Sequence, residues 1–150
     1  MANPVHLTKL KEGVEAWNKW RKDKPKIRRD LTDANLTDAN LRKTDLGYAS
    51  LTGAVLERAD LKEANLFGVN LRKANLFGAD LRGANLRRAD LAEANLEAAN
   101  IKGAGNLEVE QLCEAKTLYK VKLDQELEKQ VMGKCPHLLE TPKHETGLGK

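Results

Sequence analysis

The sequence has few aromatic residues, few cysteines and no long apolar run. Aromatic residues are 4% of its 150 residues, so any hydrophobic core must consist mainly of aliphatic side chains. No segment approaches the roughly 18–20 consecutive apolar residues that a membrane-spanning helix requires, so no transmembrane segment is expected. The two cysteines, Cys113 and Cys135, are too few for a disulfide scaffold but enough for one bridge.

A strong charge of one sign is also lacking. The net charge is +4, from 26 basic and 22 acidic side chains. The excess lies in residues 1–27, which contain 7 basic and 3 acidic side chains, whereas residues 28–103 contain 12 and 11. The N-terminal region is too charged for a secretory signal peptide, so the sequence as written indicates a cytoplasmic protein.

The dominant feature of the sequence is an internal repeat of five residues. Leucine occurs at every fifth position from 31 to 96, and Ile101 completes fifteen units. Alanine fills 12 of the 14 sites at every fifth position from 34 to 99, and Asp or Asn fills 13 of the 15 sites just before the central residue. The four exceptions are Thr44, Val69, Ser50 and Val55. The consensus of one unit is therefore A-(D/N)-L-x-x.

A period of five fits neither a continuous α-helix nor a continuous strand. On a helix, residues five apart are rotated by about 500°, so the leucines would scatter around the axis. In one long strand, side chains five apart point to opposite faces. Within one unit, however, the alanine and the leucine are two residues apart and share a face. A short extended piece followed by a corner satisfies both conditions, and four such units close a square coil, giving about four coils in all.

The residue types suit this geometry. Alanine is small enough for the crowded interior near a corner, and leucine fills the remaining space at each level. The Asp or Asn side chain can accept a hydrogen bond from nearby backbone and so stabilise the corner. Glycines follow the central residue where a corner needs a positive φ, namely Gly53, Gly68, Gly78 and Gly83.

With this consensus, the run from Asp30 to Gly103 resembles the pentapeptide-repeat proteins. The flanking motifs N-P-x-H-L, G-V-x-x-W-N-x-W-R, L-C-x-A-K-T-L-Y and L-D-x-x-L resemble those of bacterial, especially cyanobacterial, members. The resemblance implies an all-β solenoid, a right-handed quadrilateral β-helix. It also implies that most relatives have no known biochemical function, that some mimic DNA and shield type II topoisomerases, and that others act through protein contacts. Removal of a leader segment would place such a protein in the periplasm or thylakoid lumen.

Helices are predicted on both sides of the repeat, where they would cover the core of the terminal coils. Residues 4–22 have apolar side chains at helical spacing, and Asn3 followed by proline is typical of a helix start. Short helices are expected around residues 108–116 and over 125–134, the second with Asp124 as N-cap. A monomer is expected if both ends are covered, and an end-to-end dimer if one is not. We predict four parts: an N-terminal capping helix with a basic linker (1–28), the β-helix (29–105), a C-terminal helical cap (106–140) and a flexible tail (141–150).

No set of residues indicates catalysis or cofactor binding. The sequence has no Ser–His–acid set, phosphate-binding loop or paired-carboxylate pocket, and a leucine-filled core leaves no cleft. Cys113, Cys135 and His137 lack the second paired motif of a zinc site, so no metal is expected. The two cysteines have two possible states. They form a bridge across a helical hairpin, which would suit an oxidising compartment, or they are two buried free thiols.

Surface residues of every fourth unit lie on one face of the predicted solenoid. One face would present a basic ladder with steps of about 4.8 Å, consisting of Arg42, Lys62, Arg82 and Lys102. The ladder could bind an anionic partner, although a solenoid surface also needs charge for solubility. Phe67 and Phe77 are outward aromatic residues and further candidate contact points. A cation–π pair with Arg87, one coil beyond, would account for Phe67 equally well.

Seven Lys or Arg residues lie within residues 19–29. Such a run can bind nucleic acid or anionic lipid, but a solvated linker between helix and solenoid is favoured here. We therefore predict a non-catalytic scaffold with an unidentified protein partner, and no nucleic-acid partner is expected. A DNA mimic that protects a topoisomerase is the alternative. It is disfavoured because, the corner aspartates aside, residues 28–103 present 12 basic and 6 acidic groups.

Overall fold

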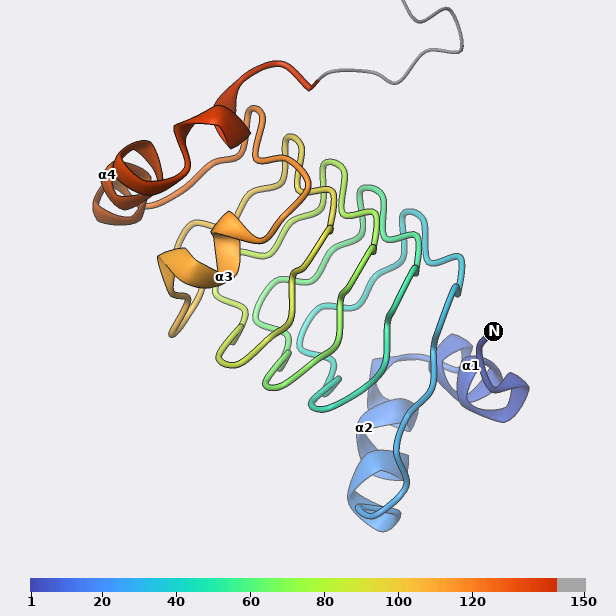
Figure 1. The fold of residues 1–150 in the computed structure, drawn as a ribbon. Helices are drawn as coiled ribbons and strands as arrows, with labels where there is room; N and C mark the ends of the chain where they lie inside the picture. Colours follow the sequence, from blue (N-terminus) through green and yellow to red (C-terminus); the bar gives the residue numbers. More distant parts are fainter. Residues whose placement is uncertain (143–150) are drawn as a thin grey trace, which may run out of the picture.

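The computed structural model describes residues 1–142 as a stack of coils with helices at both ends (Figure 1). Of the predicted tail, residues 143–150 lie outside the described residues. No helix within the described range is long and apolar enough to cross a lipid bilayer.

The helices lie before and after the repeat. Two helices precede it, α1 (Pro4–Lys11) and α2 (Val14–Asp23). Up to residue 142, two helices and a 3-10 turn follow it, α3 (Val109–Cys113), α4 (Gln125–Lys134) and η1 (Pro136–Leu139). Figure 1 shows the first two at one end of the coil stack and the others at the opposite end.

Parallel bridges between residues 20 positions apart hold successive coils together. The regular series runs from Asp30↔Ser50 to Asn85↔Gly105, with one bridge for every five residues. Four bridges therefore belong to each coil, which gives the coil four sides, as the period predicted. Among the described residues each unit contributes one bridged residue and no longer strand forms. The β-structure is a set of single bridges stacked in four columns.

Backbone hydrogen bonds follow the same spacing. The Leu61 N–H donates to the Asp80 carbonyl at 2.8 Å, and the Asp80 N–H donates to the Ala59 carbonyl at 3.0 Å. At each corner the alanine N–H of the next unit donates to the preceding leucine carbonyl, as from Ala64 to Leu61 at 3.0 Å. The backbone polar groups of a coil are thus satisfied by its neighbours and by its own corners.

Aspartate and asparagine stabilise the corners as predicted. In all thirteen units that have one, the side-chain Oδ1 accepts a hydrogen bond from the N–H two residues later. Examples are Asp60 with the Lys62 N–H at 3.1 Å and Asn70 with the Arg72 N–H at 3.0 Å. This local bond mimics a backbone turn, so each unit encodes its own corner.

Every one of the fifteen units has a positive φ at the second residue after its central position. The predicted glycines have this conformation, with φ between 64° and 70° at the four positions. Ten units, however, have another residue there, with φ between 55° and 61°, which the sequence analysis missed. The next coil or the segment that follows the last coil holds nine of these ten residues in place, because their N–H groups donate to it, as Lys73 does to the Ala92 carbonyl at 3.0 Å. Such bonds offset the cost of left-handed backbone, about 1–2 kcal/mol per residue.

Leucine and alanine fill the interior of the coils. The fifteen central residues, from Leu31 to Ile101, are at most 5% exposed, and most of the alanines are buried beside them. They form one continuous hydrophobic cluster that extends to Leu10 and Trp17 at one end and to Leu112 at the other. The predicted aliphatic core is therefore confirmed, and the side chains available for binding lie outside it.

The N-terminal segment forms two helices, so the predicted single helix over residues 4–22 is wrong. Gly13 separates them, with φ 115° and ψ 166°, a conformation that glycine adopts because it has no Cβ. Asn3 caps α1 as predicted, since its Oδ1 accepts the Val5 N–H at 2.9 Å. The break lets both Leu10 and Trp17 be buried.

The α2 helix is bonded to the backbone of the first coil. The Trp17 Nε1 donates to the Asp45 carbonyl at 2.7 Å, and the Trp17 side chain is completely buried. Asn18 donates from Nδ2 to the Lys43 carbonyl at 3.0 Å and accepts the Asp45 N–H at 2.8 Å. These contacts fix the start of the coil stack against α2.

The C-terminal helices differ in detail from the prediction. The first is shorter than the expected 108–116, because Glu114 already ends α3. The α4 helix has the predicted bounds, but the Asp124 side chain makes no capping bond and instead accepts the Gly103 N–H at 2.9 Å. Cys113 and Cys135 form a disulfide with a Cα–Cα distance of 5.8 Å, so the alternative of two free thiols is wrong.

The stability of the N-terminal contacts should depend on pH through His6. Its side chain is 7% exposed, and its Nδ1 accepts the Asp30 N–H at 2.9 Å. Burial, and then the nearby Arg29 charge, lower the pKa of His6 from its ordinary 6.5. Because the unfolded chain takes up this proton at a higher pH than the folded chain, the free energy of unfolding should decrease as pH falls below about 6.5. Urea unfolding at pH 7.5 and pH 5 measures the difference.

The control for this prediction is His6→Gln, which cannot titrate. The lowered pKa of Asp30, held down by hydrogen bonds from Thr32, affects stability only below its ordinary 3.8, outside this range. If the variant loses as much stability between pH 7.5 and pH 5 as the unchanged protein, His6 is not the responsible group.

Candidate binding surface

The predicted basic ladder lies on one face, but three of its four residues are paired with carboxylates. Its members are 20 residues apart, in register with the bridges of that column. Ion pairs join Arg42 to Glu63 at 3.3 Å, Lys62 to Asp60 at 3.6 Å and Arg82 to Asp80 at 2.6 Å. The hydrogen bond from Arg82 lowers the pKa of Asp80. The ladder therefore has less free positive charge than the sequence suggested.

The two outward phenylalanines belong to different columns of the solenoid. Phe77 is 37% exposed and lies on a different face from the basic ladder. Phe67 packs edge-on against Tyr48, with ring centroids 5.3 Å apart. The Arg87 and Arg88 guanidinium groups lie 6.0 and 5.8 Å from the Phe67 ring, so the expected cation–π contact is present. The six predicted surface residues thus do not form one site.

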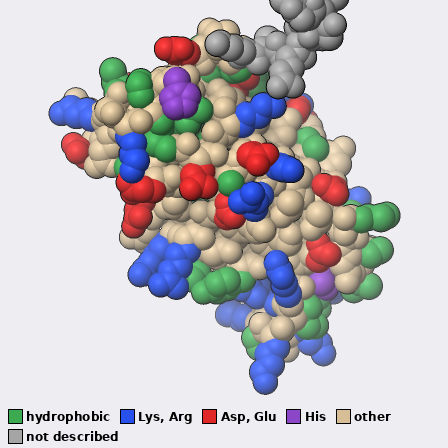
Figure 2. Space-filling view, in the orientation of Figure 1, with side chains coloured by type: hydrophobic (Ala, Val, Ile, Leu, Met, Phe, Trp, Pro, Cys, Tyr) green, Lys and Arg blue, Asp and Glu red, His purple; other side chains and the backbone are tan. Residues whose placement is uncertain are grey.

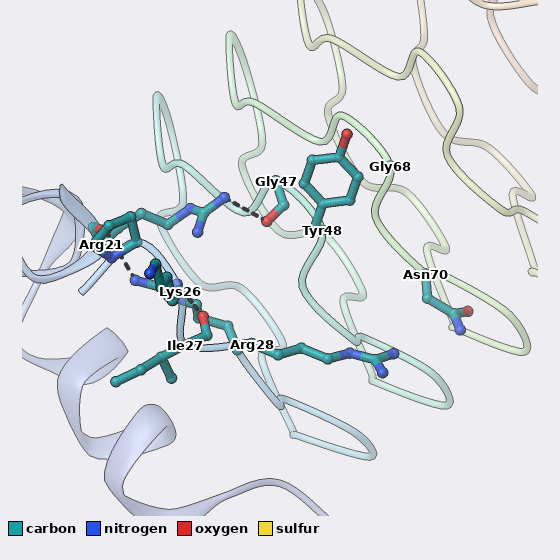
Figure 3. A pocket seen from close by; sticks show the side chains of 10 residues that line it. Arg21, Lys26, Ile27, Arg28, Gly47, Tyr48, Gly68 and Asn70 are labelled. Carbon is teal, nitrogen blue, oxygen red and sulfur yellow. Dashed lines mark hydrogen bonds between the residues drawn. The ribbon is translucent and has the colours of Figure 1, made fainter.

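Tyr48 marks a surface that the sequence analysis did not single out. It is 60% exposed, directly beside a pocket of about 380 Å³ between the N-terminal linker and the coils (Figure 3). We call this the linker pocket. It is lined by Arg21, Pro25, Lys26, Ile27, Arg28, Arg29, Gly47, Tyr48, Gly68 and Asn70. No carboxylate is among these residues, and four of them are cations.

Arg29 is the most buried of the cations that line the linker pocket. It is 1% exposed, and its guanidinium lies 4.8 Å above the Trp20 ring. It donates hydrogen bonds to three main-chain carbonyls, those of Arg21, Lys24 and Ile27. Burial, followed by the Arg21 charge, lowers the pKa of Arg29, and no ion pair of Arg29 is found within residues 1–142.

Arg21 connects the linker pocket to the coils. One of its terminal nitrogens donates to the Gly47 carbonyl at 2.8 Å (Figure 3). Its Nε lies 3.3 Å from Asp45 Oδ1. Lys26 and Arg28 lie in the loop after α2, and their side chains are exposed. Figure 3 shows the Arg28 side chain extended along the edge of the coils that carries Tyr48 and Asn70.

The surface view shows the same concentration of charge. Lys and Arg side chains gather around α2 and along the adjacent edge of the coils, with few Asp or Glu side chains among them on this face (Figure 2). The sequence favours a solvated linker for the basic run of residues 19–29. The structure instead folds part of it against the coils, where Arg21 and Arg29 are partly or fully buried.

The edge of the linker pocket allows a prediction on Gly68. Its φ is +64°, and an added Cβ would lie 2.7 Å from Tyr48 Cε1, which is too close. Gly68→Ala should therefore cost both the left-handed backbone and a displacement of Tyr48, about 2 kcal/mol or more in the free energy of unfolding. Urea denaturation followed by circular dichroism measures this cost.

A matched control for this substitution is Gly83→Ala. Gly83 has φ +70°, but a Cβ there would lie 3.4 Å from Glu63 Cγ, an ordinary contact. This control should therefore lose only the backbone contribution, about 1 kcal/mol. Equal losses at the two positions would show that Tyr48 does not pack over Gly68.

Comparisons with known proteins agree with the geometry of the coils. The family model for pentapeptide repeats matches eight copies over residues 34–72 and 70–104. The chain is 41% identical to the pentapeptide-repeat protein Rfr23 from the cyanobacterium Cyanothece 51142, over 65% of this chain and 61% of that one, with a TM-score of 0.52. It thus spans less than two thirds of Rfr23. No curated protein matches.

Two other solved structures resemble the chain. The pentapeptide-repeat protein alr5209 from Nostoc PCC 7120 is 32% identical over 74% of this chain and 95% of that one, with a TM-score of 0.55. QnrB1, a plasmid-mediated fluoroquinolone resistance protein, is 24% identical over 71% of this chain and 54% of that one, with a TM-score of 0.51. The second likeness concerns the fold alone.

Proposed function

Because the chain belongs to the pentapeptide-repeat family, whose members fold as right-handed quadrilateral β-helices, we propose that it is a non-catalytic scaffold that binds another protein. The interior of the coils is filled by leucine and alanine, so binding must use the outer faces and the linker. The observation that carries the proposal is the linker pocket, where exposed Tyr48 and four cations lie together without a lining carboxylate. Exposed aromatic residues and arginine are enriched where proteins bind one another.

We propose that the helices at both ends act as caps. A solenoid without caps exposes the apolar core of its terminal coils and associates end to end. Trp17 is buried at the first coil and Leu112 near the last, which supports a monomer. The chain is thus divided into the N-terminal cap with its linker (1–28), the β-helix (29–105) and the C-terminal cap (106–140).

We also propose that the protein works in an oxidising compartment, such as a periplasm or a thylakoid lumen. The disulfide between Cys113 and Cys135 supports this over the cytoplasm, because glutathione and thioredoxin keep cytosolic thiols reduced. Alkylation of the protein from its native source, with and without reduction, measures the thiol state. Free thiols in the native protein would contradict the proposal.

Photocrosslinking tests the proposed function. Benzoylphenylalanine at position 48 lies beside the linker pocket, and at position 77 it lies on another face. Crosslinking in a lysate of the native source should give a discrete protein adduct from position 48 and a weaker one from position 77. Failure of every outward position to give an adduct above an uncrosslinked control would contradict a scaffold role.

The alternative, a DNA mimic that protects gyrase, requires regularly spaced negative charge on the outside. With the corner aspartates set aside, residues 30–103 present 10 basic and 6 acidic groups, and the linker pocket adds cations. We therefore expect no inhibition of gyrase supercoiling at micromolar concentrations of the protein. Strong inhibition would favour the DNA-mimic function over the scaffold function. The ion-paired residues Arg42, Lys62 and Arg82 would then be the first to substitute.

A further inference from the structure

The linker pocket contains more positive charge than the surrounding carboxylates neutralise. Arg29 is 1% exposed, and its described contacts are main-chain carbonyls and the Trp20 ring. Carbonyl oxygens carry only partial charge, and a buried charge is normally paired with an opposite charge. The Nε of Arg29 is buried and has no hydrogen-bond partner among residues 1–142.

The neighbouring carboxylate is already engaged. Asp45 Oδ1 lies 3.3 Å from Arg21 Nε, and the same oxygen accepts the Asn65 Nδ2 at 2.9 Å and the Gly47 N–H at 3.1 Å. Asp45 therefore serves Arg21, its own corner and the adjacent coil. Within residues 1–142 no ion pair of Lys26 or Arg28 is found, so the charges of these two exposed side chains are available to an anion from outside.

The walls of the linker pocket also include apolar surface. Ile27 is 40% exposed and Tyr48 60% exposed, and Pro25 lies between the cations. An aliphatic wall beside cations suits a peptide that alternates acidic and apolar side chains. The sugar-phosphate backbone of a nucleic acid offers only small sugar C–H groups and no long apolar side chain to bury against Ile27, so a protein segment fits the surface better.

We propose that the linker pocket binds an acidic segment of a protein partner, whose carboxylates lie beside Arg28 and Lys26 and whose apolar side chains pack separately on Ile27 and on Tyr48. The inference rests on the proposed scaffold function and names the chemistry of its partner. Charge complementarity of this kind accelerates encounter and selects the partner. Buried Arg29 lies behind this loop and holds it in place by donating hydrogen bonds to the main-chain carbonyls of Arg21 and Lys24.

A labelled peptide tests the inference on the full chain. The fluorescein-labelled peptide Glu-Glu-Leu-Glu-Glu-Phe-Glu-Glu is titrated with the protein, and its anisotropy is followed at about 0.15 M NaCl. Lys26→Glu with Arg28→Glu should weaken binding by about tenfold or more. The matched control, Lys102→Glu with Lys122→Glu, has the same change in net charge at exposed sites on the last unit and the C-terminal segment beside it. This control should weaken binding less than about twofold.

The side chains of Lys26 and Arg28 are exposed, so the variant should fold, and an unchanged melting temperature verifies this. Lys26→Gln with Arg28→Gln should also weaken binding, because the loss of attraction is enough without repulsion. Absence of peptide binding to the unchanged protein, or equal weakening by the pocket and control variants, would overturn the inference. Tighter binding of a 20-base-pair DNA duplex that the pocket variant abolishes would overturn it in favour of nucleic acid.

The two proposals fail in different ways. If benzoylphenylalanine at position 48 captures a protein equally well in the Lys26→Glu, Arg28→Glu background, the scaffold function stands and the acidic-segment inference is wrong. If no outward position captures a protein, the scaffold function itself is wrong, whatever the labelled peptide does.

Discussion

Replacing Trp17 with alanine is expected to reduce the free energy of unfolding by about 4 kcal/mol. The Trp17 side chain is completely buried, and its Nε1 donates to the Asp45 carbonyl at 2.7 Å. The substitution would leave a cavity over the first coil and remove the hydrogen bond of that carbonyl. Urea denaturation followed by far-ultraviolet circular dichroism measures the loss, and hydrogen exchange should show faster opening of the first coil.

Two controls divide this loss into its parts. Trp17→Phe keeps most of the buried ring but loses the N–H, so it should cost about 1–2 kcal/mol. Val5→Ala in the same segment removes an exposed side chain and should change stability by less than about 0.5 kcal/mol. If Trp17→Ala costs no more than Val5→Ala, α2 does not cover the coils, and the proposal that it acts as a cap is wrong.

The coils could be predicted almost completely, because one short rule is repeated at every level. The spacing of leucine and alanine determines which side chains face inward, and the Asp or Asn before each leucine determines where the corner lies. Fifteen repetitions of this rule make chance agreement negligible, and no distant contact can change the outcome of any single unit. Each coil depends only on its neighbours.

The left-handed corner residues show the limit of reading residue types alone. Glycine at positions such as 53 or 83 indicates a positive φ, but Lys73 or Glu93 at the same place in the unit gives no such sign. The regular spacing does predict a positive φ at this place in every unit, because a repeated corner requires the same backbone conformation each time. Gly13 was the opposite case, since a single glycine inside an apolar helical pattern gives no certain sign of a break.

The linker pocket could not be predicted, since it depends on how a non-repeating segment folds against a repeating one. Arg21 and Arg29 belong to a basic run that looks solvated in the sequence, yet they contact the corner at Gly47 and the Trp20 ring. One signal was present: Tyr48 and Phe67 interrupt the polar surface on the same edge of adjacent coils. Aligning the units by column, rather than along the chain, would have brought these two aromatic residues together.

Removal of the disulfide is expected to have the second large effect. The bridge joins the end of α3 to the residue after α4, with a sequence separation of 22. Closing a loop of this length in the unfolded chain is worth about 3 kcal/mol. Because each part of a solenoid contacts only its neighbours, the loss should be confined to the C-terminal helices. Dithiothreitol should thus speed hydrogen exchange in α4 while the central coils stay protected.

The variant Cys113→Ala with Cys135→Ala should show fast exchange in α4 with or without dithiothreitol, which separates the disulfide from other effects of the reductant. Lys134→Ala is the matched control, because Lys134 joins the same two helices through an ion pair with Glu110 at 2.8 Å. That pair is exposed and should contribute less than about 1 kcal/mol. Equal exchange in α4 before and after reduction would mean that packing of buried Val131, rather than the disulfide, holds the helices together.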